Sequence, residues 1–226
     1  MVKRLLALAP VALAAALLAL PAQAVPPAAS AAPSAPPASS SSTFPIAITV
    51  AVENGVPARD DAWIGTQIDD ANALYGPLDL RFRRTLRKEM SAAHAQMHTR
   101  EDRDALGALM EKNVIDVFVV AALEDVDEPG RYRKGVAWTQ RTSGARYIIL
   151  SAAAPRTVLA HELGHFFGNG HSSVPDNLMS YTRSGGKVFL DDAQVARVHA
   201  FAAKFLAAGR LADVGPANSP AIPDAG

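Results

Sequence analysis

The chain has 226 residues, and 22 Lys and Arg residues balance 22 Asp and Glu residues, for a formal net charge of +0. That balance gives no reason to expect nucleic acid or an anionic lipid surface as a partner. The chain contains no cysteine, which excludes a disulfide framework, a cysteine nucleophile and a latency device built on a thiol.

Residues 1–24 have the pattern of a secretory signal peptide. Lys3 and Arg4 precede an apolar run over residues 5–20, and Ala22-Gln23-Ala24 matches an A-x-A cleavage site. Cleavage after Ala24 would place the protein outside the cytoplasm, either secreted or in a bacterial periplasm. A retained membrane anchor is the weaker alternative, because the apolar run is short for a spanning helix. We therefore expect no stable membrane association.

Two further segments have compositions that are typical of chain outside a folded core. Residues 25–42 are Pro, Ala and Ser with a single Val, which predicts an extended linker. Residues 208–226 are rich in Pro, Gly and Ala, which predicts a disordered tail. Residues 43–207 remain as one domain, and that length is enough to bury a core.

Within this domain the hydrophobic pattern alternates between strands and helices. Five stretches rich in apolar and β-branched residues are predicted strands: 44–52, 78–85, 114–122, 135–140 and 146–150. Three predicted helices cover 60–75, a stretch that begins near Pro155, and 191–206. Residues 88–112 are expected to be helical or irregular. The order predicts an α/β fold with a mixed sheet.

Residues 161–171 read HELGHFFGNGH and carry the strongest functional signal. His161 and His165 are four residues apart, so on a helix both imidazoles reach the same cation. Gly168 allows the helix to end, and the turn returns His171 as a third ligand. Three protein ligands leave one position for water, as in catalytic zinc sites, and Glu162 would face that position as the general base.

The residues downstream extend this signal, because Met179 and Tyr181 lie in the sequence NLMSY. HExxHxxGxxH followed by such a methionine resembles the metzincin clan of zinc metallopeptidases. The resemblance implies that Met179 lies beneath the three histidines. It also implies that Tyr181 lies close to the zinc and stabilises the oxyanion, since Met-x-Tyr is typical of the astacin and serralysin branches. The residues assign no subfamily.

The resemblance also implies a fold and an activity. The fold would be a twisted, mostly parallel sheet with an antiparallel edge strand over 135–139, an active-site helix and a small C-terminal helical subdomain. The activity would be that of a secreted zinc endopeptidase, with Zn²⁺ as cofactor and an extended peptide or protein as substrate. A zinc hydrolase acting on cell-wall peptides is one alternative. A non-catalytic zinc-binding module is another, although Glu162 argues against it. We expect a monomer.

Three other clusters have both a structural and a functional interpretation. His94 and His98 are four residues apart, but no third ligand follows, so a solvated surface is favoured over a second metal site. The acidic residues of 124–128 lack the periodic oxygen pattern of a calcium loop. A basic cluster is interpreted as a charged strand edge, with a preference for acidic substrates as the alternative: Arg81, Arg83, Arg84, Arg87 and Lys88.

Overall fold

A computed structural model gives the structure of the chain, and it describes residues 41–215. The predicted signal peptide, the linker up to residue 40 and the last residues of the predicted tail lie outside this range. The described residues belong to one compact unit. Among them, no helix combines the length and the apolar character needed to cross a membrane.

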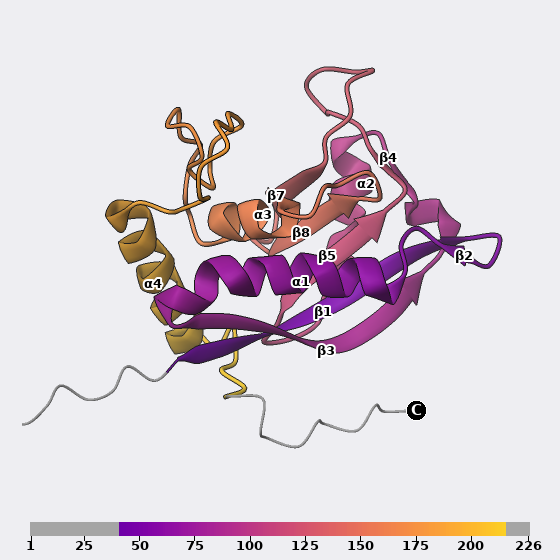
Figure 1. The fold of residues 1–226 in the computed structure, drawn as a ribbon. Helices are drawn as coiled ribbons and strands as arrows, with labels where there is room; N and C mark the ends of the chain where they lie inside the picture. The colour runs from indigo at the N-terminus through magenta and orange to yellow at the C-terminus, as the bar shows by residue number, and fades with distance from the viewer. Residues whose placement is uncertain (1–40, 216–226) are drawn as a thin grey trace, which may run out of the picture. The chain divides into compact units, whose positions relative to one another are not determined.

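The main sheet is mixed and mostly parallel (Figure 1). Its strand order is β2-β1-β5-β8-β7, and β3 also pairs with β1. The β1–β3, β1–β5 and β5–β8 pairs are parallel, whereas β7 pairs antiparallel with β8. The strands are β1 (Ser42–Glu53), β2 (Val56–Pro57), β3 (Leu80–Met90), β5 (Ile115–Val120), β7 (Gly135–Thr139) and β8 (Arg146–Ser151). A second sheet pairs β4 (Gln96–Met97) with β6 (Ala122–Leu123).

The helices cover both faces of the main sheet. They are α1 (Asp61–Tyr75), α2 (Arg100–Ala105), α3 (Val158–Phe166) and α4 (Asp192–Ala207), with short 3₁₀ turns at Gly76–Leu78, Ala92–His94 and Leu106–Leu109. Residues of α1, α3 and α4 share one hydrophobic core with one face of the sheet, and Figure 1 shows α1 beside α3. The other face packs against the small sheet and the segment that follows α2.

Burial explains why the central strands are so apolar. Every residue of β5 is buried, as expected for a strand covered on both faces. The residues of β7 are only partly buried, because this strand has β8 as its one partner in the sheet. The expected fold class is therefore confirmed: a mostly parallel mixed sheet with an antiparallel edge strand, a helix carrying the histidine motif and a C-terminal helix.

Several expected boundaries differ from the structure. The strand expected over 78–85 continues to Met90, because β3 follows β1 over its length, with a bulge near Ile46. The apolar run 114–122 is divided between β5 and β6. The helix expected to begin near Pro155 begins at Val158, because residues 155–157 form a turn in which Val158 N–H donates to the Pro155 carbonyl at 3.1 Å.

The start of the predicted disordered tail needs a correction. Within residues 208–215, the side chain of Leu211 is only 4% exposed and belongs to the main hydrophobic core. Val214 N–H donates to the Thr43 carbonyl at 2.9 Å, and Thr43 N–H donates to Asp213 Oδ1 at 3.0 Å. These contacts fix the segment to the beginning of β1 despite its composition, so the folded domain extends beyond residue 207.

Candidate metal centre

Helix α3 and the turn after it bring the three histidines of the motif together. His161 and His165 are one turn apart on α3. Gly168 then takes a φ of +86°, which favours glycine, and a Cβ there would lie 2.6 Å from the Phe201 ring. Glycine is therefore required at this position for two reasons: the positive φ of its backbone and the lack of space for a Cβ beside Phe201. The turn returns the chain so that His171 faces the two helical histidines.

The Nε2 atoms of the histidines converge. The distance from His165 Nε2 is 3.1 Å to His161 Nε2 and 3.1 Å to His171 Nε2. On the opposite side of two rings, the Nδ1 atoms are engaged by backbone carbonyls. His161 Nδ1 donates to Leu178 O at 2.8 Å, and His165 Nδ1 donates to Asn169 O at 2.7 Å. A proton on Nδ1 leaves a lone pair on Nε2, which is the ligand form of imidazole.

Burial favours the neutral form of all three rings. It lowers the pKa of His161 and of His171, and it lowers the pKa of His165 to about 4. His165 Nε2 lies 3.1 Å from each of the other two neutral nitrogens, and their lone pairs repel one another unless a cation lies between them. Two nitrogens about 2.0–2.1 Å from one zinc lie about 3.3 Å apart at a tetrahedral angle. The donor set therefore fits zinc, and within residues 41–215 it is the one group of its kind.

The side chain of Glu162 extends from α3 toward the edge strand β7. Its side chain is buried, at 5% exposure. Burial raises the pKa of Glu162 to about 8, against smaller opposing effects from the Ala137 backbone N–H and the charge of Arg133. A Cβ on Gly135 would lie 2.9 Å from Glu162 Oε1. The first residue of β7 therefore has to be small for the carboxylate to occupy this position.

Met179 is part of a tight loop that packs against α3. It is fully buried, and a Cβ on Gly164 would lie 2.3 Å from the Met179 sulfur. Met179 N–H donates to Asn177 Oδ1 at 2.9 Å, and Asn177 is in turn bonded to Gln194 of α4 at 2.7 Å. Ser172 N–H donates to Met179 O at 2.9 Å, which connects the loop to the segment of the third histidine.

Tyr181 lies at the open side of the cluster. Its hydroxyl is 2.7 Å from His171 Nε2, the nitrogen that faces the other two histidines. The residue is 73% exposed, so its ring borders the solvent-filled side of the centre. Partial burial and the charge of Glu162 raise the pKa of Tyr181, which keeps its hydroxyl protonated and able to donate.

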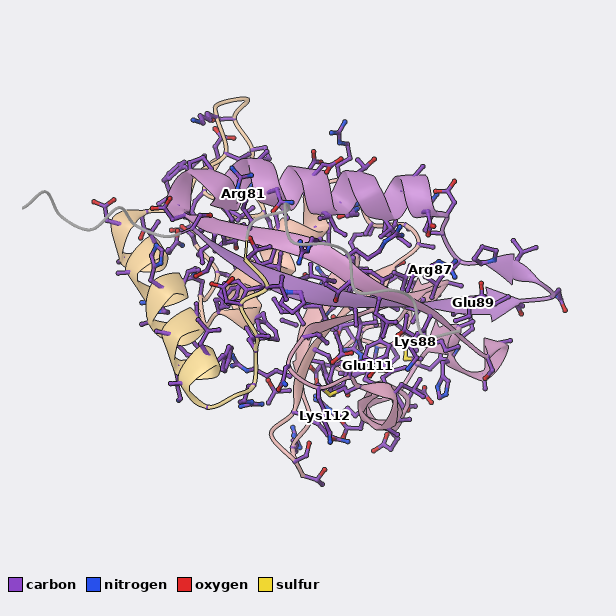
Figure 2. The ribbon with its side chains drawn as sticks, turned by 90° about the horizontal axis from the view of Figure 1, so that it is seen from below. Arg81, Arg87, Lys88, Glu89, Glu111 and Lys112 are labelled. Carbon is purple, nitrogen blue, oxygen red and sulfur yellow. The ribbon has the colours of Figure 1, made fainter. Side chains whose placement is uncertain are left out.

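The other candidates from the sequence lie outside this cluster. His94 is in a 3₁₀ turn, whereas His98 bonds to Glu124 at 2.6 Å. The acidic residues of the loop 124–128 face arginines: Asp125 pairs with Arg133, Asp127 with Arg100 and Glu128 with Arg131. Members of the basic cluster on β3 are likewise paired, as Arg84 and Arg87 contact Asp61. Lys88 contacts Glu111, and both side chains are labelled in Figure 2.

Arg133 is a charged neighbour of the centre that the motif does not predict. Asp125 Oδ2 holds its guanidinium at 2.6 Å. Burial is the main cause that lowers the pKa of His171, and the charge of Arg133 is the second. The same charge also lowers the pKa of Glu162 and of Tyr181, against larger effects that raise both. This proximity arises from the packing of the loop before β7, for which the sequence carries no periodic or spacing signal.

No family model matches the sequence, and a comparison with curated proteins gives no match. Among solved structures, a mirolysin complex with compound 9 has 13% identity and a TM-score of 0.55, covering 72% of this chain and 91% of that chain. Mature mirolysin of Tannerella forsythia with a cleaved peptide has 13% identity and a TM-score of 0.54, covering 72% and 92%. Metalloproteinase-II of Bacteroides fragilis has 14% identity and a TM-score of 0.50, covering 71% and 53%.

At these identities the likeness concerns the fold. The described chain therefore has the α/β fold of these solved structures, with a three-histidine cluster on α3 and in the turn after it.

Proposed function

We propose that the chain is a secreted zinc-dependent endopeptidase. The observation that carries this proposal is the convergence of three neutral imidazole nitrogens beside the buried carboxylate of Glu162. The likeness in fold to mirolysin, which was solved with a cleaved peptide, supports peptides as the substrate class. The leader-like residues 1–24 support export to the periplasm or the medium.

His161, His165 and His171 would hold the zinc. When bound, zinc supplies Lewis acidity, which polarises the scissile carbonyl and lowers the pKa of a coordinated water toward ~7. The carbonyls of Leu178 and Asn169 keep the two helical imidazoles in the tautomer that this requires.

Glu162 would act as the general base. It is adjacent to His161 in sequence, and its buried side chain lies against Gly135 of the edge strand. The carboxylate would take a proton from the attacking water and later deliver it to the leaving amine. This sequence hydrolyses the peptide bond without a covalent intermediate, so no serine or cysteine nucleophile is needed.

The substrate would lie extended along β7. This strand pairs with β8 on one side, and its residues are only partly buried. The backbone groups of the free side can pair with a peptide, which then forms an additional strand. Because Gly135 of β7 abuts Glu162, a peptide bound there would pass close to the general base. One chain supplies all of these groups, so a monomer suffices.

Tyr181 would donate a hydrogen bond to the oxyanion that forms on the scissile carbonyl. Its position 2.7 Å from His171 Nε2, on the open side of the cluster, supports this role.

Two alternatives differ from this proposal in substrate or in chemistry. A zinc hydrolase acting on cell-wall peptides would use the same centre with a different cleft. A non-catalytic zinc module would have no use for a buried carboxylate beside the histidines, and Glu162 therefore speaks against it.

A profile of cleaved bonds would test the proposal. The purified chain is incubated with a peptide library and with casein, with and without a chelator, and peptidoglycan is assayed in parallel. We expect cleavage within peptides that the chelator abolishes. Hydrolysis of peptidoglycan alone would favour the cell-wall alternative, and zinc binding without any hydrolysis would favour the non-catalytic module.

A further inference from the structure

A pocket of about 350 Å³ lies at the far end of α3 from its N-terminus. It is formed where the segment before β5 meets the turn that follows α4. Phe166 and Phe205 supply an apolar wall, and Arg146 and Arg210 supply two guanidinium groups. Its volume is within the range of small-molecule sites, which usually combine an apolar lining with a few convergent polar groups.

The two arginines are held in place by backbone carbonyls. Arg146 Nη1 donates to Phe166 O at 2.7 Å, and Arg210 Nη2 donates to Gly144 O at 3.0 Å. The Arg210 guanidinium also lies 5.4 Å from the Phe205 ring centroid. Each guanidinium carries five N–H donors, so most donors on both side chains remain available.

The charges of these two arginines lie close enough to repel each other. Within residues 41–215, neither Arg146 nor Arg210 forms an ion pair with a carboxylate. Burial and the nearby charge of Arg210 lower the pKa of Arg146. Arg146 is partly removed from water and lies near a like charge, and a bound anion would offset both costs.

The remaining charges at the rim do not supply that anion. Glu111 lines the pocket, but its carboxylate is paired with Lys88 of β3. Lys112 follows it in the chain and adds a third cation, and Figure 2 shows both side chains on the segment before β5. The rim therefore has an excess of positive charge next to an apolar wall.

We propose that this pocket binds a monocarboxylate with an apolar body, such as the C-terminal residue of a peptide that ends in leucine. The carboxylate would lie between Arg146 and Arg210, whose planar donors suit bidentate contacts. The apolar side chain would lie against Phe166 and Phe205. None of the three histidines of the cluster lines this pocket, and binding there requires no peptide hydrolysis.

The test is a titration of the zinc-supplemented full chain with N-acetyl-L-leucine. Calorimetry and the NMR shifts of the backbone amides monitor the binding. For a ligand of this size we expect saturable binding with a Kd of about 0.1–1 mM. The largest amide shifts should be those of Asn113, Gly209 and Leu211. N-acetyl-L-leucinamide lacks the charge and acetate lacks the apolar body, so both should bind at least about tenfold more weakly.

Two matched variants distinguish the pocket from the rest of the surface. Arg210→Gln removes one guanidinium from an exposed turn and should weaken N-acetyl-L-leucine at least about tenfold. Arg156→Gln removes an arginine that pairs with Asp70 elsewhere, and it should leave the affinity unchanged. Thermal unfolding of both variants checks that each is folded.

Three results would overturn the proposal. The first is the absence of saturable binding by the wild-type chain. The second is binding that a chelator abolishes while Arg210→Gln retains it, which would place the ligand at the histidine cluster. The third is equal binding of acetate or of the amide. The chain could bind N-acetyl-L-leucine through Arg210 and yet show no peptidase activity. That result would support the proposed carboxylate pocket and contradict the proposed peptidase function.

Discussion

The Nδ1 atom of His161 lies 2.8 Å from the carbonyl oxygen of Leu178, which is 17 residues downstream. Leu178 directly precedes Met179, so the loop that carries the methionine also orients the first histidine of the motif. A carbonyl that accepts from Nδ1 fixes the tautomer and the ring orientation of a metal-binding imidazole. The two halves of the sequence signal are therefore physically connected through one hydrogen bond.

Metal binding should be measurable directly. We expect the purified chain to bind about one zinc per molecule, and a chelator should abolish hydrolysis and lower the Tm by several degrees, because a ligand bound only to the folded state stabilises it. His171→Ala removes one of three ligands and should weaken zinc binding strongly. Metal analysis that finds no zinc in a folded, active preparation would contradict the proposed centre.

Glu162→Ala should retain the fold and the zinc but lose activity by several orders of magnitude, because it removes only the proposed base. Rates on a fluorogenic peptide, zinc content and thermal unfolding are the measurements. Glu53→Ala, at the exposed end of β1, is the matched control and should be fully active. A Glu162→Ala variant that kept more than about a tenth of the wild-type rate would show that the base lies elsewhere.

Tyr181→Phe tests the oxyanion role. If the hydroxyl contacts the substrate mainly in the transition state, kcat should fall about 10–10³-fold while KM changes little. Zinc content should be unchanged, since all three histidines remain. A variant with an intact kcat and a lowered Tm would identify Tyr181 as a packing residue instead.

Gly164→Ala tests the contact between α3 and the methionine loop. Alanine is the better helix former by about 1 kcal/mol, but its Cβ would lie 2.3 Å from the Met179 sulfur. We expect the steric effect to prevail and the free energy of unfolding to fall by about 1–3 kcal/mol. Gly65→Ala on α1 is the control, because a Cβ there meets nothing within 4 Å, and that variant should be more stable. Equal stabilisation of both variants would refute the close contact.

Asp116 gives a prediction about pH. Its side chain is buried, its Oδ1 accepts from Glu111 N–H at 3.0 Å, and its Oδ2 has no hydrogen-bond partner. Burial raises the pKa of Asp116 to about 7. The folded state therefore binds this proton more tightly than the unfolded state does. The contribution to stability is complete below about pH 4 and is lost as the pH rises toward 7.

Asp116→Asn removes that titration. Between pH 5 and pH 8 the wild-type free energy of unfolding should fall by roughly 2–3 kcal/mol more than that of the variant. Urea unfolding of both proteins at the two pH values measures this difference, in which all other titrating groups cancel. Parallel pH profiles would mean that Asp116 is already ionised in the folded protein at pH 5, so that its pKa is not raised.

How much the sequence predicts depends on whether a feature is local. The pairing of His161 with His165 follows from helix geometry alone, and Gly168 at the turn follows from its backbone freedom. The sheet type also follows, because largely apolar runs such as residues 115–120, interrupted only by Asp116, indicate strands buried on both faces. These features require no knowledge of what packs against them.

Features that depend on distant partners were not predictable in the same way. The sequence of the second half of β3 is rich in charge and has no clear strand pattern. It forms a strand because it pairs with β1, and ion pairs to Asp61 support this pairing. Arg133 approaches the histidine cluster only because Asp125 holds it there. The carbonyls of Leu178 and Asn169 belong to the backbone, so side-chain identity gives no sign of their role.

The hydrogen bonds between Thr43 and the segment at Asp213 and Val214 have a consequence for biogenesis. The first strand of the described domain is completed by residues that leave the ribosome only after α4 has been made. A nascent chain that has emerged only as far as α4 still lacks the contacts that close the beginning of β1. The order of emergence therefore favours a domain whose first strand stays incomplete until residues 213 and 214 have been synthesised.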